Sequence, residues 1–113
     1  GRPGGRPTRF QRLSASGNMQ NGVARSSNIF YQDAEMRVRG GGRIDFNSED
    51  LDCNLFVKTD RMQEFPVRVT GTLHDPKTSV SAGTAILYAV TSLTHGIFEL
   101  LGGVMEGTWN LFR

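Results

Sequence analysis

Apolar and polar positions alternate with a period of two along much of residues 13–73. Residues 36–46 show the pattern most clearly, because apolar residues and glycines take the even positions while arginines and Asp45 take most of the odd ones. This period is typical of a β-strand with one dry face and one solvated face. The alternation predicts five strands, at about residues 10–20, 22–32, 34–46, 50–58 and 65–73.

Short polar links separate the predicted strands. Asn21-Gly22, after the first strand, favours a two-residue hairpin turn because both residues tolerate positive φ. Parallel neighbours would need much longer connections, so we expect an antiparallel meander. At Asp75-Pro76, the proline lacks an amide hydrogen and disfavours helix at the preceding residue, which predicts that the sheet ends there.

The long apolar segment that follows has a helical period. Apolar residues recur at spacings of three and four from Ile86 to Val104, and Ser81 is in the position of an N-cap. We expect a helix over about residues 82–112, kinked or broken near Gly102-Gly103. Threonine, serine and histidine dilute it too strongly for a membrane-spanning helix.

A single-layer sheet cannot bury its apolar face alone, so the helix should lie across that face. The predicted fold class is therefore α+β, with an antiparallel five-stranded β-meander that has one apolar face and packs against a C-terminal α-helix. Two roles for the helix remain open. It completes the core of the domain, or it caps an apolar groove on that face.

The dry face of the predicted sheet is a continuous apolar surface. Acyl chains could contact it, because neither the surface nor the chains need hydrogen-bond partners there. The candidate apolar groove consists of Met36, Val38, Ile44, Phe46, Leu51, Leu55, Val57, Phe65, Val67, Val69 and Leu73. The candidate cap or partner-contact residues are Phe98, Met105, Trp109 and Phe112.

The net charge of +2 on the 113-residue chain comes largely from its beginning, where Arg2, Arg6, Arg9 and Arg12 lie in the first dozen positions. Glycine and proline separate the first of these arginines, and Phe10 is the only aromatic residue among them. We therefore interpret residues 1–9 as a disordered linker or an artificial edge of the chain, and expect no nucleic-acid partner. Residues 10–113 should form one domain.

Catalytic chemistry is not expected. His74 and His95 have no second histidine or cysteine at ligand spacing, so neither a metal nor another cofactor is predicted. The glycines of Gly40–Gly42 lack the Lys-Ser/Thr pair of a phosphate-binding loop, and a close strand contact or a bulge explains them better. Cys53 lies on the dry face, where a buried structural thiol is expected. The residues therefore favour a non-enzymatic protein.

The order of these motifs resembles the C-terminal region of AsmA-like proteins of the bacterial envelope. The resemblance covers about residues 10–80. Its points of likeness are Asn21-Gly22-Val23-Ala24, Gly40–Gly42 leading into Ile44-Asp45-Phe46, Leu51-Asp52, and Pro66-Val67 running to Gly71-Thr72-Leu73 and Asp75-Pro76. It implies a periplasmic segment of a longer, inner-membrane-anchored protein, with a curved sheet that has an apolar inner groove. If upstream strands build most of that groove for lipid, the helix would plug or cap its end. The absence of an initiator methionine and of an apolar signal region also suggests a C-terminal piece.

The resemblance implies a role in phospholipid transport or outer-membrane assembly, with phospholipid acyl chains as the expected partner. The alternative is an assembly module that binds another envelope protein or a second copy through strand edges or helix faces. Attachment to a membrane surface ranks last, because the helical segment lacks a face rich in lysine and arginine.

Overall fold

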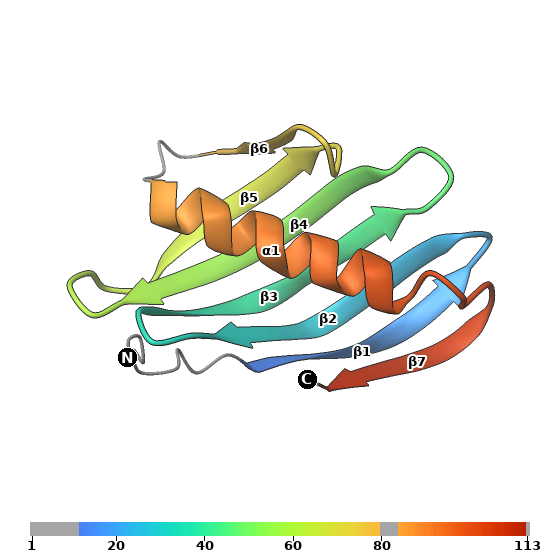
Figure 1. The fold of residues 1–113 in the computed structure, drawn as a ribbon, viewed down its shortest axis with the longest axis horizontal. Coiled ribbons are helices and arrows are strands. Elements are labelled where there is room, and N and C mark those ends of the chain that lie inside the picture. Colours follow the sequence, from blue (N-terminus) through green and yellow to red (C-terminus); the bar gives the residue numbers. More distant parts are fainter. Residues whose placement is uncertain (1–11, 80–83, 113) are drawn as a thin grey trace, which may run out of the picture.

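The computed structural model describes residues 12–79 and 84–112, which form a curved β-sheet with one helix across its concave face (Figure 1). The α+β class and the mostly antiparallel sheet are as expected, but the sheet has seven strands and not five. The elements are β1 (Arg12–Gln20), β2 (Val23–Gln32), β3 (Met36–Asp45), β4 (Asp50–Thr59), β5 (Phe65–Gly71), β6 (Pro76–Thr78), α1 (Thr84–Leu100) and β7 (Gly107–Phe112).

The five strands expected from the alternation correspond to β1–β5, each antiparallel to the next along the chain. Asn21 and Gly22 have φ values of 54° and 78°, and Gln20 pairs with Val23, so the two-residue hairpin turn is confirmed. Both β1 and the first predicted strand end at residue 20, while residues 10 and 11 lie outside the described residues, as do the predicted linker at 1–9 and the N-cap at Ser81.

The prediction that the sheet ends at Asp75-Pro76 is wrong. The chain turns there and returns as β6, in which Pro76 pairs with Gly71 at the edge of the sheet. Proline is tolerated as the first residue of an edge strand, where the ladder does not require its missing amide hydrogen. Pro76 therefore marks a turn into a short edge strand.

The predicted helix over 82–112 is also wrong in its second part. α1 ends at Leu100, a turn covers residues 101–103, and residues 107–112 form β7, which pairs with β1. The two adjacent glycines at 102 and 103 are poor helix formers, so the helical period stops there. The break that the sequence suggested at Gly102-Gly103 is thus the end of the helix.

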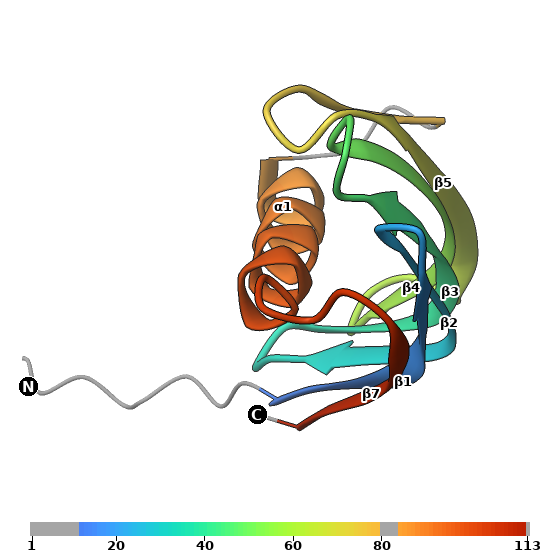
Figure 2. The ribbon, with the colours of Figure 1, turned by 90° about the vertical axis from the view of Figure 1, so that its right-hand side faces the viewer.

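The sheet is strongly curved, and α1 lies on its concave side (Figure 2). The strand order across the sheet is β6-β5-β4-β3-β2-β1-β7. Part of the curvature comes from a bulge in β2, because pairing shifts register between Ser26 and Ile29 against β3, and between Ser14 and Gly17 against β1. Bulges bend a strand and increase its local twist. The bulge therefore lies in a central strand that is paired on both sides.

The core lies between the concave face and α1. Buried α1 residues include Val90, Leu93 and Ile97, at most 3% exposed. Thr94 is also buried, and its hydroxyl donates a hydrogen bond to the Val90 carbonyl at 3.1 Å, so the helix backbone satisfies it. α1 covers the apolar face that the alternation predicted.

Candidate functional site

The candidate groove residues lie together beneath α1. Nine of them are at most 6% exposed: Met36, Val38, Ile44, Leu51, Leu55, Val57, Val67, Val69 and Leu73. Phe46 and Phe65 are partly buried and pack against this core. Phe65 pairs with Val57 near one end of β4, whereas Phe46 follows β3 beside the other end. An aromatic ring therefore stands at each end of the covered face.

Little space remains between the sheet and the helix. A cavity of about 20 Å³, lined by residues that include Cys53, Leu55, Leu93 and Trp109, lies under α1. This is close to the volume that a single water molecule needs. Among the described residues, this cavity is therefore too small for an acyl chain while α1 stays in place.

The candidate cap residues do not share one helix face. Phe98 is on α1 and stacks on Phe46, with ring centroids 4.5 Å apart and an interplanar angle of 6°. Met105 is in the link after the helix and is 72% exposed. Trp109 and Phe112 are on β7, where Trp109 is 7% exposed and Phe112 is 79% exposed. Only Phe98 caps the end of the covered face as a helical residue.

Trp109 has one unusual feature. Within the described part of the chain, its buried Nε1 has no hydrogen-bond acceptor. An unpaired buried donor has a desolvation cost of about 1–3 kcal/mol, so the indole is held by packing. The indole ring packs against Gly17: a Cβ on Gly17 would lie 2.8 Å from Trp109 Cζ2, so only glycine leaves space for the ring.

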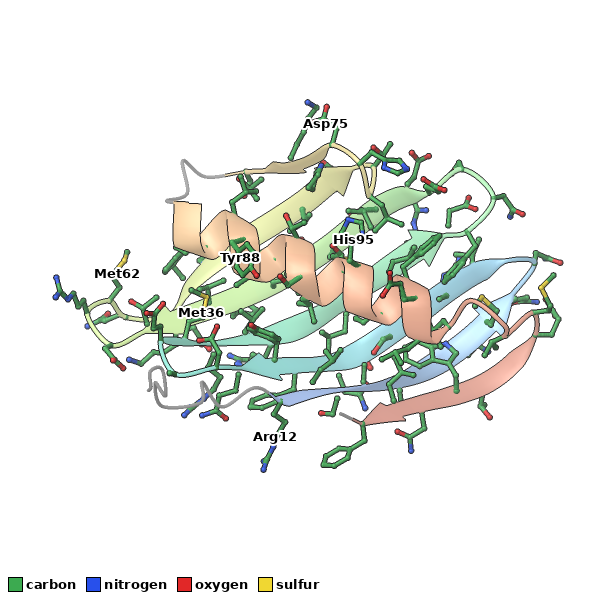
Figure 3. The ribbon with its side chains drawn as sticks, viewed as in Figure 1. Arg12, Met36, Met62, Asp75, Tyr88 and His95 are labelled. Carbon is green, nitrogen blue, oxygen red and sulfur yellow. The ribbon has the colours of Figure 1, made fainter. Side chains whose placement is uncertain are left out.

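The outer side of α1 carries apolar residues that nothing in the described chain covers. Tyr88 is 70% exposed and Leu87 is 41% exposed (Figure 3). Met62, in the loop between β4 and β5, is 50% exposed at one end of the sheet. These residues are scattered, and single exposed apolar residues are normal on a protein surface.

The outer face of the sheet is rich in arginine. Arg39 donates two hydrogen bonds to the Glu64 carboxylate, at 2.9 and 2.8 Å, and these bonds hold the pKa of Glu64 below its usual value. The same guanidinium lies 4.8 Å from the centre of the Phe56 ring. Phe56 departs from the alternation on the solvated side, and the cation–π contact explains its place there.

Sequence reasoning missed a second part of the outer face, over the bulge in β2. Ser27 and Asn28 are both exposed there, and an open hollow of about 600 Å³ extends toward Arg25 and Arg43. The signal in the sequence was the break in alternation at Ser26-Ser27-Asn28, which indicates only a weak strand. In the structure, this break is the bulge, where β2 has one residue more than β3.

The residues considered for catalysis lie apart from one another. Burial raises the pKa of Cys53 from its usual value of 9.0 to about 11, so its thiol stays protonated and unreactive. His74 Nε2 lies 2.8 Å from the Glu49 carboxylate on the surface. Among the described residues, no group of three or more His, Cys, Asp or Glu side chains could hold a metal ion.

Gly40–Gly42 have a structural role that agrees with the sequence expectation. A Cβ at Gly40 would lie 2.2 Å from the Asn54 carbonyl oxygen, so β3 and β4 approach too closely for any other residue.

Over the part of the chain that the structure describes, no helix is both long and apolar enough to cross a membrane. The chain matches no protein-family model, no curated protein and no solved structure.

Proposed function

We propose that this protein is a non-enzymatic envelope module, the terminal part of an AsmA-like β-sheet groove that takes part in phospholipid transport or outer-membrane assembly. The observation that carries the proposal is a strongly curved sheet whose concave face is mostly apolar and is covered by one helix. On this proposal the chain lies in the periplasm as part of a longer protein anchored in the inner membrane. It needs no cofactor.

The cavity under α1 is too small for lipid, so contact with acyl chains belongs at the ends of the covered face. Phe46 and Phe65 stand at these ends and remain partly accessible. In a longer groove formed by preceding strands, α1 would close the apolar channel at its last strands. The helix is then both the completion of this core and the cap of the groove.

The strand order indicates which edge of the sheet such preceding strands would join on this proposal. β1 is paired on both sides, with β2 and β7, so a further strand cannot join the sheet at β1 unless it displaces β7. The open edge on that side is β7. A continuous AsmA-like sheet would therefore grow from the edge of β7.

Photo-crosslinking in bacteria that produce the full-length protein tests the lipid contact. Benzoylphenylalanine replaces Phe46 or Phe65, and Phe56 on the outer face serves as the matched control because it is also an aromatic residue of the sheet. We expect phospholipid adducts at Phe46 or Phe65 and none at Phe56. Adducts at none of the three positions, or equally at all three, would refute the lipid-handling role.

A second candidate function is assembly through β7, with a second copy or another envelope protein as partner. β7 is an edge strand without a charged residue or proline, and Phe112 on it is 79% exposed. β6 at the opposite edge has only three residues and carries Pro76 and Lys77, both of which discourage edge pairing. The two edges therefore differ in how well they accept another strand.

A further inference from the structure

The bulge in β2 creates an opening in the side-chain layer of the outer face. Between the pairs Ser26–Gly42 and Ile29–Gly40, two β2 residues, Ser27 and Asn28, are opposed by Gly41 alone. Gly41 has no side chain to fill the space, and a Cβ there would lie 2.4 Å from the Ser26 carbonyl oxygen. Two further glycines, Gly17 and Gly42, line the hollow and contribute only backbone to it.

Asn28 holds the bulge in one arrangement. Its Oδ1 accepts hydrogen bonds from the Ser16 amide at 2.8 Å and from the Ser26 hydroxyl at 2.9 Å, and its Nδ2 donates to the Ser16 hydroxyl at 2.8 Å. The side chain thus replaces a ladder bond that the bulge removes between β1 and β2. It also leaves one amide hydrogen for another acceptor.

Two arginines face each other at the rim of the hollow. Arg25 and Arg43 are direct partners in the ladder between β2 and β3, and like charges opposite each other destabilise a sheet. The Arg43 guanidinium lies 3.9 Å from the Asp52 carboxylate, which also pairs with Arg68 at 3.2 Å. Among the described residues, no carboxylate is paired with Arg25.

The lining therefore provides many donors and little negative charge. Besides the two guanidinium groups it presents the hydroxyls of Ser16 and Ser27 and the amide of Asn18, and none of the described residues that line it carries a carboxylate. Arginine binds phosphate oxygens through two parallel N–H groups, and hydroxyl and amide donors suit the remaining oxygens. An anion between the two arginines would also relieve their repulsion.

We propose that this hollow binds a phosphate group, with Arg25 and Arg43 holding its oxygens and the Asn28 bulge shaping the floor. The phosphate is that of a small phosphate ester or of a phospholipid headgroup, since both present the same oxygens to the arginines. The proposal concerns the outer face and does not rest on the lipid role of the concave face. The photo-crosslinking experiment and the test below can therefore fail separately.

The test is an NMR titration of the ¹⁵N-labelled chain with inorganic phosphate at constant ionic strength. We expect saturable shifts of the Asn28 side-chain amide and of the Arg25 and Arg43 Nε–H signals. Arg25→Gln should weaken binding about tenfold, because one charge-assisted contact is lost. Arg39→Gln is the matched control: it removes the same charge from the same face, but Glu64 already pairs with Arg39, so binding should be unchanged.

Asn28→Asp provides a second variant of nearly the same shape. Its carboxylate can still accept from the Ser16 amide, but it places a negative charge in the hollow, so phosphate binding should be lost while the thermal unfolding temperature is kept. If shifts do not saturate, or if Arg25→Gln and Arg39→Gln weaken binding equally, the site does not exist. Retained binding in folded Asn28→Asp would equally overturn it.

Co-sedimentation with phosphatidylglycerol vesicles separates the two sources of phosphate. A loss with Arg25→Gln that exceeds the loss with Arg39→Gln assigns the site to a lipid headgroup. Phosphate binding without such a difference on vesicles assigns it to a small phosphate ester. Arg25-dependent binding of a single-stranded oligonucleotide that far exceeds phosphate binding would replace the proposal with a nucleic-acid surface.

Discussion

Cys53 illustrates how burial alone decides the chemistry of a side chain. The thiol is 3% exposed in the cavity wall under α1, and a thiolate there would lose its hydration. The sequence placed Cys53 on the dry face from its neighbours Leu51 and Leu55, and this placement is confirmed. A lone thiol in that environment is a small apolar residue of the core.

The raised pKa of Cys53 predicts a pH dependence of stability. Between its usual value of 9.0 and the folded value of about 11, the unfolded chain releases the thiol proton while the folded chain keeps it. The free energy of unfolding therefore falls through this range, by about 3 kcal/mol at most. Urea unfolding at several pH values should show the fall, and Cys53→Ala should lack this part of it. Parallel pH profiles for the two proteins would contradict the prediction.

Gly17 shows what a single-residue pattern cannot reveal. In the sequence it is a small residue within an alternating strand. In the structure, a Cβ at this position would lie only 1.7 Å from the carbonyl oxygen of Arg25, on the neighbouring strand β2. β1 and β2 approach closely at this point, next to the bulge. The need for glycine comes from a contact with another strand, which the local sequence does not contain.

α1 depends on one face for its attachment to the sheet. Leu93 is 1% exposed, whereas Leu87, six positions earlier on the same helix, is 41% exposed. The segment is apolar well beyond one stripe, so its sequence did not distinguish core residues from surface residues. The tertiary structure separates them because the concave face reaches only one side of the helix.

Leu93→Ala should therefore lower the free energy of unfolding by about 2–5 kcal/mol, since it leaves a cavity in the core. Leu87→Ala, the same change on the exposed side, should lower it by about 1 kcal/mol or less. Urea unfolding followed by circular dichroism measures both. Similar losses for the two variants would mean that α1 does not pack on the sheet in the way described.

β7 reverses the prediction for the last dozen residues. Gly107–Phe112 is a short run that suits a strand as well as a helix, and periodicity alone does not distinguish the two. Pairing with β1 supplies partners for backbone groups that would otherwise be exposed at the edge of the sheet. Those partners lie about ninety residues away in the sequence, so no local pattern could have indicated the strand.

The two edge strands of the sheet, β6 and β7, differ in length and in charge. β6 is short and carries Pro76 and Lys77, whereas β7 has six residues and no charge. If assembly occurs through β7, the apparent mass should rise with protein concentration in sedimentation velocity. Asn110→Lys, an exposed change on β7, should shift the protein toward monomer because charge discourages edge pairing.

His74→Lys serves as the control for that experiment. It adds positive charge at the exposed turn before β6, at the other side of the sheet, and can keep the contact with Glu49. We expect the association of this variant to match that of the unchanged chain. A mass that stays monomeric at every concentration, or that falls equally in both variants, would reject assembly through β7.

The period-two alternation was sufficient to define five strands, their antiparallel order and their dry face. The reason is that the alternation of buried and exposed side chains is present in the residues of each strand by itself. It also placed the apolar residues that lie under α1. The tertiary structure alone decided the two edge strands and the hollow over the β2 bulge. Each of these depends on pairing between distant segments, so its free energy comes from contacts that no short stretch of sequence contains.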